Sequence, residues 1–258
     1  MDYHWRYHAP RATDLTADPL ADFPEEGTSP MSHDATRRAT FVLSVAEKKL
    51  LIRIADRLPR WVLPDHLTVL GMFGSMLVTA GYLLSNQAVW WLWIANLGFA
   101  INWFGDSLDG TTARVRKIQR PRYGFYLDHL TDAFATIAIG LGLGLSPYML
   151  LSVGLAIVAG YLVLSINVYL ESQVLGDFRF GYGVVGPTES RLILMGLNTA
   201  AVIMGPVPFT VFGVGATIFD LAGVVAVVGM MLMLSRRVAR NLKHLATLEP
   251  ANTRREDA

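Results

Sequence analysis

Six long apolar stretches constrain the fold of this chain more than any other feature of its sequence. They lie near residues 66–85, 88–112, 125–145, 147–172, 188–205 and 210–235, and each has about the length that a helix needs to cross a bilayer. The 258 residues are 52% hydrophobic with a formal net charge of only +1, so we expect no nucleic-acid partner. We predict an all-α, polytopic membrane bundle of six transmembrane helices.

Polar and basic segments flank this membrane domain, which we place at residues 64–245. Residues 1–40 are polar and contain several prolines, which predicts a disordered tail, and residues 246–258 form a polar C-terminal tail. Residues 41–63 place Leu50, Leu51, Ile54 and Leu58 on one helical face, with Lys and Arg on the rest. This pattern predicts a basic amphipathic helix that lies on an anionic membrane surface.

The distribution of charge orients the bundle. The connections near residues 85–87, 146–148 and 205–208 contain no Lys or Arg, whereas residues 48–60, 114–122 and 236–243 are rich in both. Because basic residues are retained on the cytoplasmic side, we expect both termini to be cytoplasmic in a multi-pass protein of the cell (inner or plasma) membrane.

Four aspartates, Asp106, Asp109, Asp128 and Asp132, fall within 27 residues, between two segments (88–104 and 133–145) that contain no charged residue. Carboxylates beside apolar helices are energetically costly, so they indicate an ion or a substrate. Asp106 and Asp109 share one helical face, and Asp128 and Asp132 share another. An antiparallel pair of helices would therefore bring all four together. Oxygen ligands favour Mg²⁺, Mn²⁺ or Ca²⁺ over zinc, and the chain has no Cys.

Small residues and one arginine accompany these acids. Gly110, Ala113 and Gly124 leave space for a ligand or another backbone, and Arg114 offers a planar fork suited to phosphate oxygens. The complete pattern, D-x-x-D-G-x-x-A-R followed by G-x-x-x-D-x-x-x-D, resembles the signature of the CDP-alcohol phosphotransferases, which are integral-membrane enzymes of phospholipid synthesis. All eight signature residues are present. Nine residues separate Arg114 from Gly124, where the family pattern has eight.

The resemblance implies a transferase that moves a substituted phosphate from a CDP-linked donor to a hydroxyl acceptor and releases CMP. It implies two divalent ions, Mg²⁺ or Mn²⁺. Asp106, Asp109 and Asp128 would be metal ligands, and Asp132 would be the catalytic base with a further contact to metal. Gly110, Ala113, Arg114 and Gly124 would line the site of the CDP moiety.

The run P-D-H-L-T at residues 64–68 is similar to the entry of the first span in the same family. Asp65 and Thr68 would then contact the nucleotide, although Asp65 is also well placed as a helix N-cap. Arg191, at the start of the fifth span, would bind the phosphate of an acceptor or a lipid; the alternative is an anchor at the membrane interface. Asp220 lies within the sixth predicted span, where we expect a polar partner such as Asn102 or Asn167.

Several functional alternatives stay open at this point. The first is CDP-diacylglycerol as donor with a small polar acceptor. The second is a CDP-choline or CDP-ethanolamine type of reaction with diacylglycerol as acceptor, which His129 favours because that branch of the family has His there. A cation-coupled transporter is the third, but its acids would lie near the bilayer midplane in a repeated unit, which this sequence lacks. The Gly-rich spans also permit a homodimer among membrane lipids.

Overall fold

The computed structural model describes residues 44–175, 186–211 and 213–249. The predicted disordered tail at residues 1–40 and the last part of the predicted C-terminal tail lie outside these ranges. The helices are α1 (Ser44–Arg57), α2 (Pro64–Leu84), α3 (Leu92–Val115), α4 (Pro121–Gly144), α5 (Leu151–Leu175), α6 (Pro187–Met204) and α7 (Ile218–Leu248), with a short 3₁₀ turn, η1 (Val89–Trp91), before α3.

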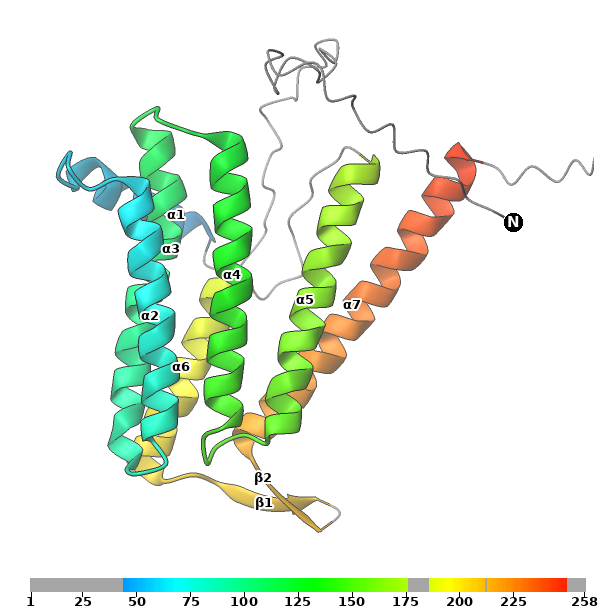
Figure 1. Ribbon diagram of the computed structural model, residues 1–258. Helices are drawn as coiled ribbons and strands as arrows, with labels where there is room; N and C mark the ends of the chain where they lie inside the picture. Colours follow the sequence, from blue (N-terminus) through cyan, green and yellow to red (C-terminus); the bar gives the residue numbers. More distant parts are fainter. Residues whose placement is uncertain (1–43, 176–185, 212, 250–258) are drawn as a thin grey trace, which may run out of the picture. The chain divides into compact units, whose positions relative to one another are not determined.

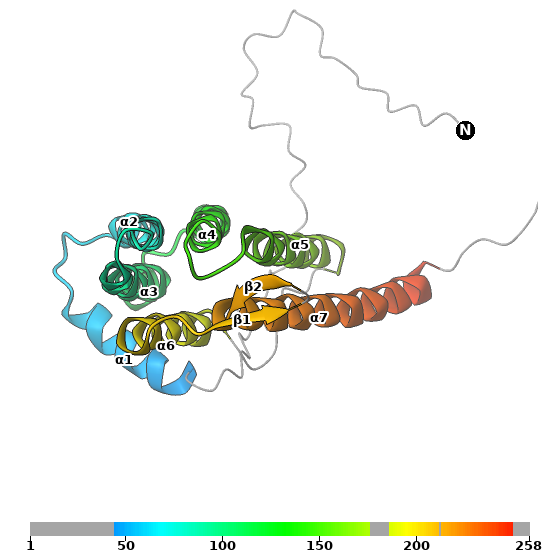
Figure 2. The same ribbon diagram turned by 90° about the horizontal axis from the view of Figure 1, so that it is seen from below.

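Helices α2 to α7 run alternately up and down, so that their connections gather at two ends (Figure 1). Viewed along the helices, α2, α4 and α5 form one layer and α3, α6 and α7 a second (Figure 2). Helix α2 packs against α3 and α4, α5 packs between α4 and α7, and α6 packs on α3. The described part of the chain is therefore a two-layered helical assembly, as the all-α prediction requires, with one short β-hairpin.

Glycines bring α2 and α3 into direct backbone contact. A Cβ on Gly98 would lie 2.6 Å from the backbone nitrogen of Val78, and a Cβ on Gly105 would lie 2.7 Å from the Cα of Gly71. No side chain fits at such separations, so glycine is what permits this close approach. Because Gly105 immediately precedes Asp106, the contact fixes the position of that carboxylate relative to α2.

A buried polar network joins α2, α3 and α6. The Tyr82 hydroxyl donates to Asn198 Oδ1 (3.2 Å), Asn198 Nδ2 donates to Asn96 Oδ1 (2.9 Å), and Asn96 Nδ2 donates to Thr199 Oγ1 (3.1 Å). Tyr82 and Asn198 are completely buried. Satisfied polar groups in an apolar interior are costly to separate, so this network sets the register of α6 against α3.

Helix α1 packs on α3 through residues that include Leu51, Ile54 and Leu58 of the predicted apolar face. Leu51 and Ala55 are buried in a small core with Leu67 and Leu108, whereas Leu50 is 46% exposed. Leu50 therefore does not share in this core, and its place on a membrane-facing side of α1 stays a prediction. The location of α1 on a membrane surface stays a prediction.

In the described residues, three helices are long and apolar enough to cross a membrane: Pro64–Leu84, Leu151–Leu175 and Ile218–Leu248. These helices support a membrane protein. The other three helices of the two layers contain aspartates in α3 and α4, and Glu189 and Arg191 in α6. The six-span topology stays a prediction.

The start of the sixth predicted span is wrong. Strands β1 (Pro208–Val211) and β2 (Val214–Thr217) form an antiparallel hairpin where we expected helix, and α7 begins only at Ile218. β-branched residues favour strand here, and Gly213 takes a positive φ of 82° in the turn. Asp220 is consequently in the first turn of α7, where its carboxylate accepts from the backbone nitrogens of Leu150 (2.7 Å) and Thr217 (2.8 Å). Its predicted pairing with Asn102 or Asn167 is wrong.

Candidate functional site

Three of the four aspartates converge where the last turns of α3 lie beside the first turns of α4. One carboxylate oxygen from each of Asp106, Asp128 and Asp132 lies within 4.8 Å of the other two, and all three residues are partly buried. The antiparallel arrangement of α3 and α4 produces this cluster, because residues near the end of one helix face residues near the start of the next.

The connection between these helices contains the residue that is additional to the family pattern. Helix α3 ends at Val115, and Lys117 takes a left-handed φ of 57° while the Ile118 nitrogen donates to the Ala113 oxygen (3.0 Å). Pro121 then starts α4, where its missing N–H costs nothing. The connection accommodates the additional residue without preventing the convergence of Asp106, Asp128 and Asp132.

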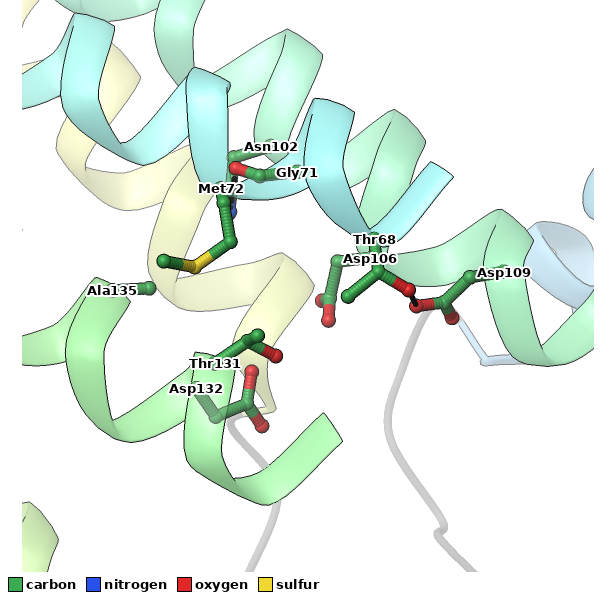
Figure 3. A pocket seen from close by; sticks show the side chains of 9 residues that line it. All are labelled: Thr68, Gly71, Met72, Asn102, Asp106, Asp109, Thr131, Asp132 and Ala135. Atoms are coloured by element: carbon green, nitrogen blue, oxygen red, sulfur yellow. Dashed lines mark hydrogen bonds between the residues drawn. The ribbon is translucent and has the colours of Figure 1, made fainter. Parts of the chain in front are cut away.

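Asp109 lies apart from this cluster but lines the same cavity. Its Oδ2 accepts a hydrogen bond from Thr68 Oγ1 at 2.7 Å, and its Oδ1 accepts from the Gly110 nitrogen at 2.5 Å. In Figure 3, Thr68, Asp106 and Asp109 line one side of the cavity, and Thr131 and Asp132 of α4 face them from the other. The structure thus places Asp106, Asp109 and Asp132 in the lining of one cavity, and Asp128 lies within 4.8 Å of Asp106 and Asp132 without lining it.

The donor set of this cavity fits a hard divalent cation. Its candidate ligands are carboxylate oxygens, with the hydroxyls of Thr68 and Thr131 nearby. Like-charged carboxylates this close together repel unless a cation lies between or beside them. Oxygen-only sites of this kind suit Mg²⁺ or Mn²⁺.

Arg191 of α6 reaches the cluster from a third helix. Its Nη2 donates to Asp106 Oδ2 at 2.6 Å, and its side chain is only 15% exposed. The guanidinium is therefore turned into the protein toward the acids. A contact of Arg191 with a substrate phosphate stays a prediction.

Asp65 is not the N-cap of α2. Leu63 occupies that position, Pro64 is the first helical residue, and Asp65 follows it in the first turn, where its negative charge is favourable. The Asp65 carboxylate forms an ion pair with Arg120 from the α3–α4 connection. The capping alternative is wrong because the helix starts at Pro64, two residues earlier than we expected. A contact of Asp65 with a nucleotide stays a prediction.

The non-acidic signature residues, Gly110, Ala113, Arg114 and Gly124, do not line the cavity. Arg114 Nη2 donates to Thr111 Oγ1 (3.1 Å), and a Cβ on Gly110 would lie 3.2 Å from Arg114 Nη1, so the glycine leaves room for the guanidinium. Ala113 is partly buried on the same helix. Gly124 is exposed one turn before Asp128, and a Cβ there would meet no atom within 4 Å.

Sequence reasoning missed two residues that support the site. Asn102, one turn before Asp106, donates from Nδ2 to the Gly71 oxygen (3.0 Å) and to Ser75 Oγ (2.9 Å), which ties α3 to α2 beside the cavity. Its signal was that it is one of only two amide side chains, with Asn96, in the charge-free segment 88–104. Glu47 of α1 accepts hydrogen bonds from Trp103 of α3 and Thr188 of α6, and its basic surroundings in the sequence gave no distinctive signal for this role.

Membrane-length apolar helices and an acid cluster near one end of a helix pair are expected of a membrane-embedded metal-dependent enzyme or of an ion carrier. Comparison with protein families decides between these classes. The family model of the CDP-alcohol phosphatidyltransferases matches residues 61–235, and the chain belongs to this family of phosphotransferase enzymes. Its members transfer a phosphate-linked group from a CDP-alcohol to an acceptor in phospholipid synthesis, and they generally depend on divalent metal. No curated protein sequence matches the chain.

Proposed function

We propose that this protein transfers the phosphatidyl group of CDP-diacylglycerol to the hydroxyl of a small polar acceptor and releases CMP. The observation that carries the proposal is the convergence of Asp106, Asp128 and Asp132 within 4.8 Å, beside the Thr68–Asp109 pair. A pyrophosphate donor requires concentrated cationic charge, and this constellation of carboxylates supplies the ligands for it.

Asp106, Asp109 and Asp128 would hold two divalent ions, Mg²⁺ or Mn²⁺, with Asp132 as a further ligand. When bound, the ions neutralise the diphosphate and stabilise the CMP that leaves. Thr68 fixes the rotamer of Asp109 through its 2.7 Å hydrogen bond, and ligands oriented in this way bind metal more strongly. Asp65 and Thr68, together with Gly110, Ala113, Arg114 and Gly124, would receive the CDP moiety.

Asp132 is the proposed general base. It faces the cavity from α4, across from Asp106 and Asp109 on α3 (Figure 3). In the reaction, the acceptor oxygen forms a bond to the β-phosphorus, the bond from that phosphorus to the CMP oxygen breaks, and the hydroxyl proton passes to Asp132. Arg191, which lies beside Asp106, would bind the phosphate of an acceptor or of the lipid substrate.

The charge distribution supports a cytoplasmic site in the cell membrane with both termini on the same side. The acid-bearing end of α3 and α4 has Arg116, Lys117, Arg120 and Arg122 around it, whereas the connections at the opposite end contain no Lys or Arg. A water-soluble acceptor would be available there. Helix α1 would lie on this surface, and the glycine-rich helices would permit a homodimer within the lipid.

The runner-up is a CDP-choline or CDP-ethanolamine type of reaction onto diacylglycerol. His129 favours it through its position next to Asp128, with its ring 4.2 Å from that of Phe125 and 5.2 Å from that of Tyr169. Such an aromatic surrounding suits an alkylammonium group. A cation-coupled transporter is disfavoured by the family to which the chain belongs.

A matrix of CDP donors against acceptors tests the proposal. Purified protein in liposomes would be assayed for CMP release, and the lipid product would be identified by mass. We expect turnover with CDP-diacylglycerol and a polar acceptor, its loss on chelation, and its recovery with Mg²⁺ or Mn²⁺ but not Zn²⁺. Turnover only with CDP-choline or CDP-ethanolamine and diacylglycerol would establish the runner-up instead.

Asp132→Asn tests the general base. The change keeps the shape of the side chain and removes its basicity, so turnover should fall by at least about 100-fold while thermal unfolding stays as in the unmodified protein. Asp56→Asn, at an exposed acid of α1, is the matched control and should retain full turnover. Equal activity of the two variants would reject the assignment.

A further inference from the structure

Glu47 of α1 connects two helices that both contribute to the site. Its Oε1 accepts a hydrogen bond from Trp103 Nε1 of α3 and another from Thr188 Oγ1 of α6, each at 2.7 Å. All three residues are partly buried. Hydrogen bonds to a carboxylate are stronger than neutral ones, and these two are short enough for that class.

Each of the two donors lies one helical turn from a member of the Asp106–Arg191 ion pair. Trp103 lies three residues before Asp106 on α3, and Thr188 lies three residues before Arg191 on α6, so each pair shares one helical face. Asp106 and Arg191 meet at 2.6 Å. Glu47 therefore ties α3 to α6 one helical turn away from the residues that face each other at the site.

We propose that Glu47 is a positioning residue that sets the place of Arg191 relative to the carboxylates, and thereby the binding of the phosphate-bearing substrate that Arg191 contacts. This inference rests on the proposed role of Arg191. Helix α1 would then help to position a substrate-binding residue, in addition to covering the surface of α3. The carboxylate adds a second favourable contact, because Thr188 is in the first turn of α6 and negative charge is stabilised at a helix N-terminus.

Besides the Glu47 bonds, the start of α6 is tied to α3 by the Arg191–Asp106 pair itself. Within the first turn of α6, Glu189 accepts from the Gly186 nitrogen (3.0 Å). The next hydrogen bond to α3 runs from Asn96 Nδ2 to the Met195 oxygen (3.4 Å), about one helical turn beyond Arg191, and the Asn198–Asn96 bond follows about one turn later. Without Glu47, the first turn of α6 can therefore shift while the rest of the helix keeps its place.

The test compares Glu47→Ala with Glu47→Gln in the reconstituted full-length enzyme. The alanine variant loses both hydrogen bonds, whereas the glutamine variant keeps a carbonyl oxygen that can accept them. A displacement of about 1 Å at a substrate-positioning group costs up to about 100-fold in rate. We expect Glu47→Ala to raise the KM of one substrate by about 10-fold and to change kcat by no more than about twofold. That substrate should be the one whose KM is also raised by Arg191→Gln. Glu47→Gln should restore most of the difference.

A double variant shows whether Glu47 acts through Arg191. If it does, Glu47→Ala combined with Arg191→Gln should have the same KM as Arg191→Gln alone, because the group that Glu47 positions is already gone. Additive effects would overturn the proposal. Asp56→Ala is the matched control, since it removes an exposed acid from the same helix and should change neither KM nor kcat.

Two milder variants test the proposal even if Glu47→Ala fails to fold. Trp103→Phe and Thr188→Val each remove one of the two hydrogen bonds, so each should raise the same KM by a smaller factor. An unchanged KM in both variants would overturn the proposal. A fall of kcat with both KM values unchanged would also overturn it, because that result indicates a general loss of structure. Absence of turnover in the unmodified enzyme would instead reject the proposed function, so the two failures are distinct.

Discussion

Replacing Gly105 by alanine should damage the enzyme although alanine is the better helix former. A Cβ at this position would collide with the Leu67 oxygen and the Gly71 nitrogen of α2, and it would lie 2.7 Å from the Gly71 Cα. Carbon atoms in contact lie about 3.5–4.0 Å apart, so α2 and α3 would have to separate by about 1 Å. The colliding atoms are backbone, and they cannot rotate away as a side chain can.

Two opposing terms decide the size of the effect. Alanine in place of glycine in a helix gains about 1 kcal/mol from propensity, whereas overpacking a close contact costs about 1–3 kcal/mol. The net loss of stability is therefore modest, at most about 2 kcal/mol. The displacement matters more for activity, because Asp106 is the next residue and a shift of about 1 Å at a reacting site costs up to about 100-fold.

The assay combines CMP release with thermal unfolding in the same detergent. Gly105→Ala should lose about 100-fold in kcat/KM and unfold at a slightly lower temperature. Gly196→Ala is the matched control, because this helical glycine of α6 has no atom within 4 Å of a Cβ built on it. Gly196→Ala should be as active as the unmodified enzyme and equally or more stable. If both variants kept full activity, the close contact of α2 and α3 would not position Asp106 as argued.

Three further changes separate orientation of the site from stability of the fold. Thr68→Val removes the donor to Asp109 Oδ2 and should weaken activation by Mg²⁺ or Mn²⁺ by about 10–100-fold in a metal titration, whereas Thr68→Ser should behave normally. Asp220→Ala leaves the backbone nitrogens of Leu150 and Thr217 without their carboxylate, so it should lower the free energy of unfolding by about 1–3 kcal/mol in a denaturant titration and leave both KM values unchanged. Lys117→Gly relieves a positive φ and should raise thermal stability slightly, by up to about 1 kcal/mol, with normal CMP release; a loss of stability would contradict the left-handed conformation.

The sequence predicted the helical class and the convergence of four carboxylates, of which three lie in mutual proximity, because both depend on short-range spacing. Asp128 and Asp132 share a face whenever residues 121–144 are helical, and a connection of residues 116–120 forces α4 to return beside α3. The hairpin at 208–217 was missed because its residues are as apolar as those of a span. In such a segment, hydropathy cannot distinguish strand from helix, and the β-branched residues were the better indicator.

The contacts that complete the site depend on separations that no local pattern encodes. Arg191 reaches Asp106 across 85 positions, and Glu47 reaches Thr188 across 141. The sequence indicated Arg191 as a phosphate-binding candidate but not its partner Asp106. Glu47 is followed by Lys48 and Lys49 in an amphipathic helix, which is a sufficient explanation of its charge, so sequence alone gives Glu47 no special weight. The glycines of α2 and α3 are what convert these separate features into one site: they bring the α2 and α3 backbones into contact, Asp106 is held beside that contact, and α6 can then pack on α3 with Arg191 in reach. Changes to the glycine contact should therefore disturb Asp106 and Arg191 together, whereas changes to Glu47 should disturb Arg191 alone.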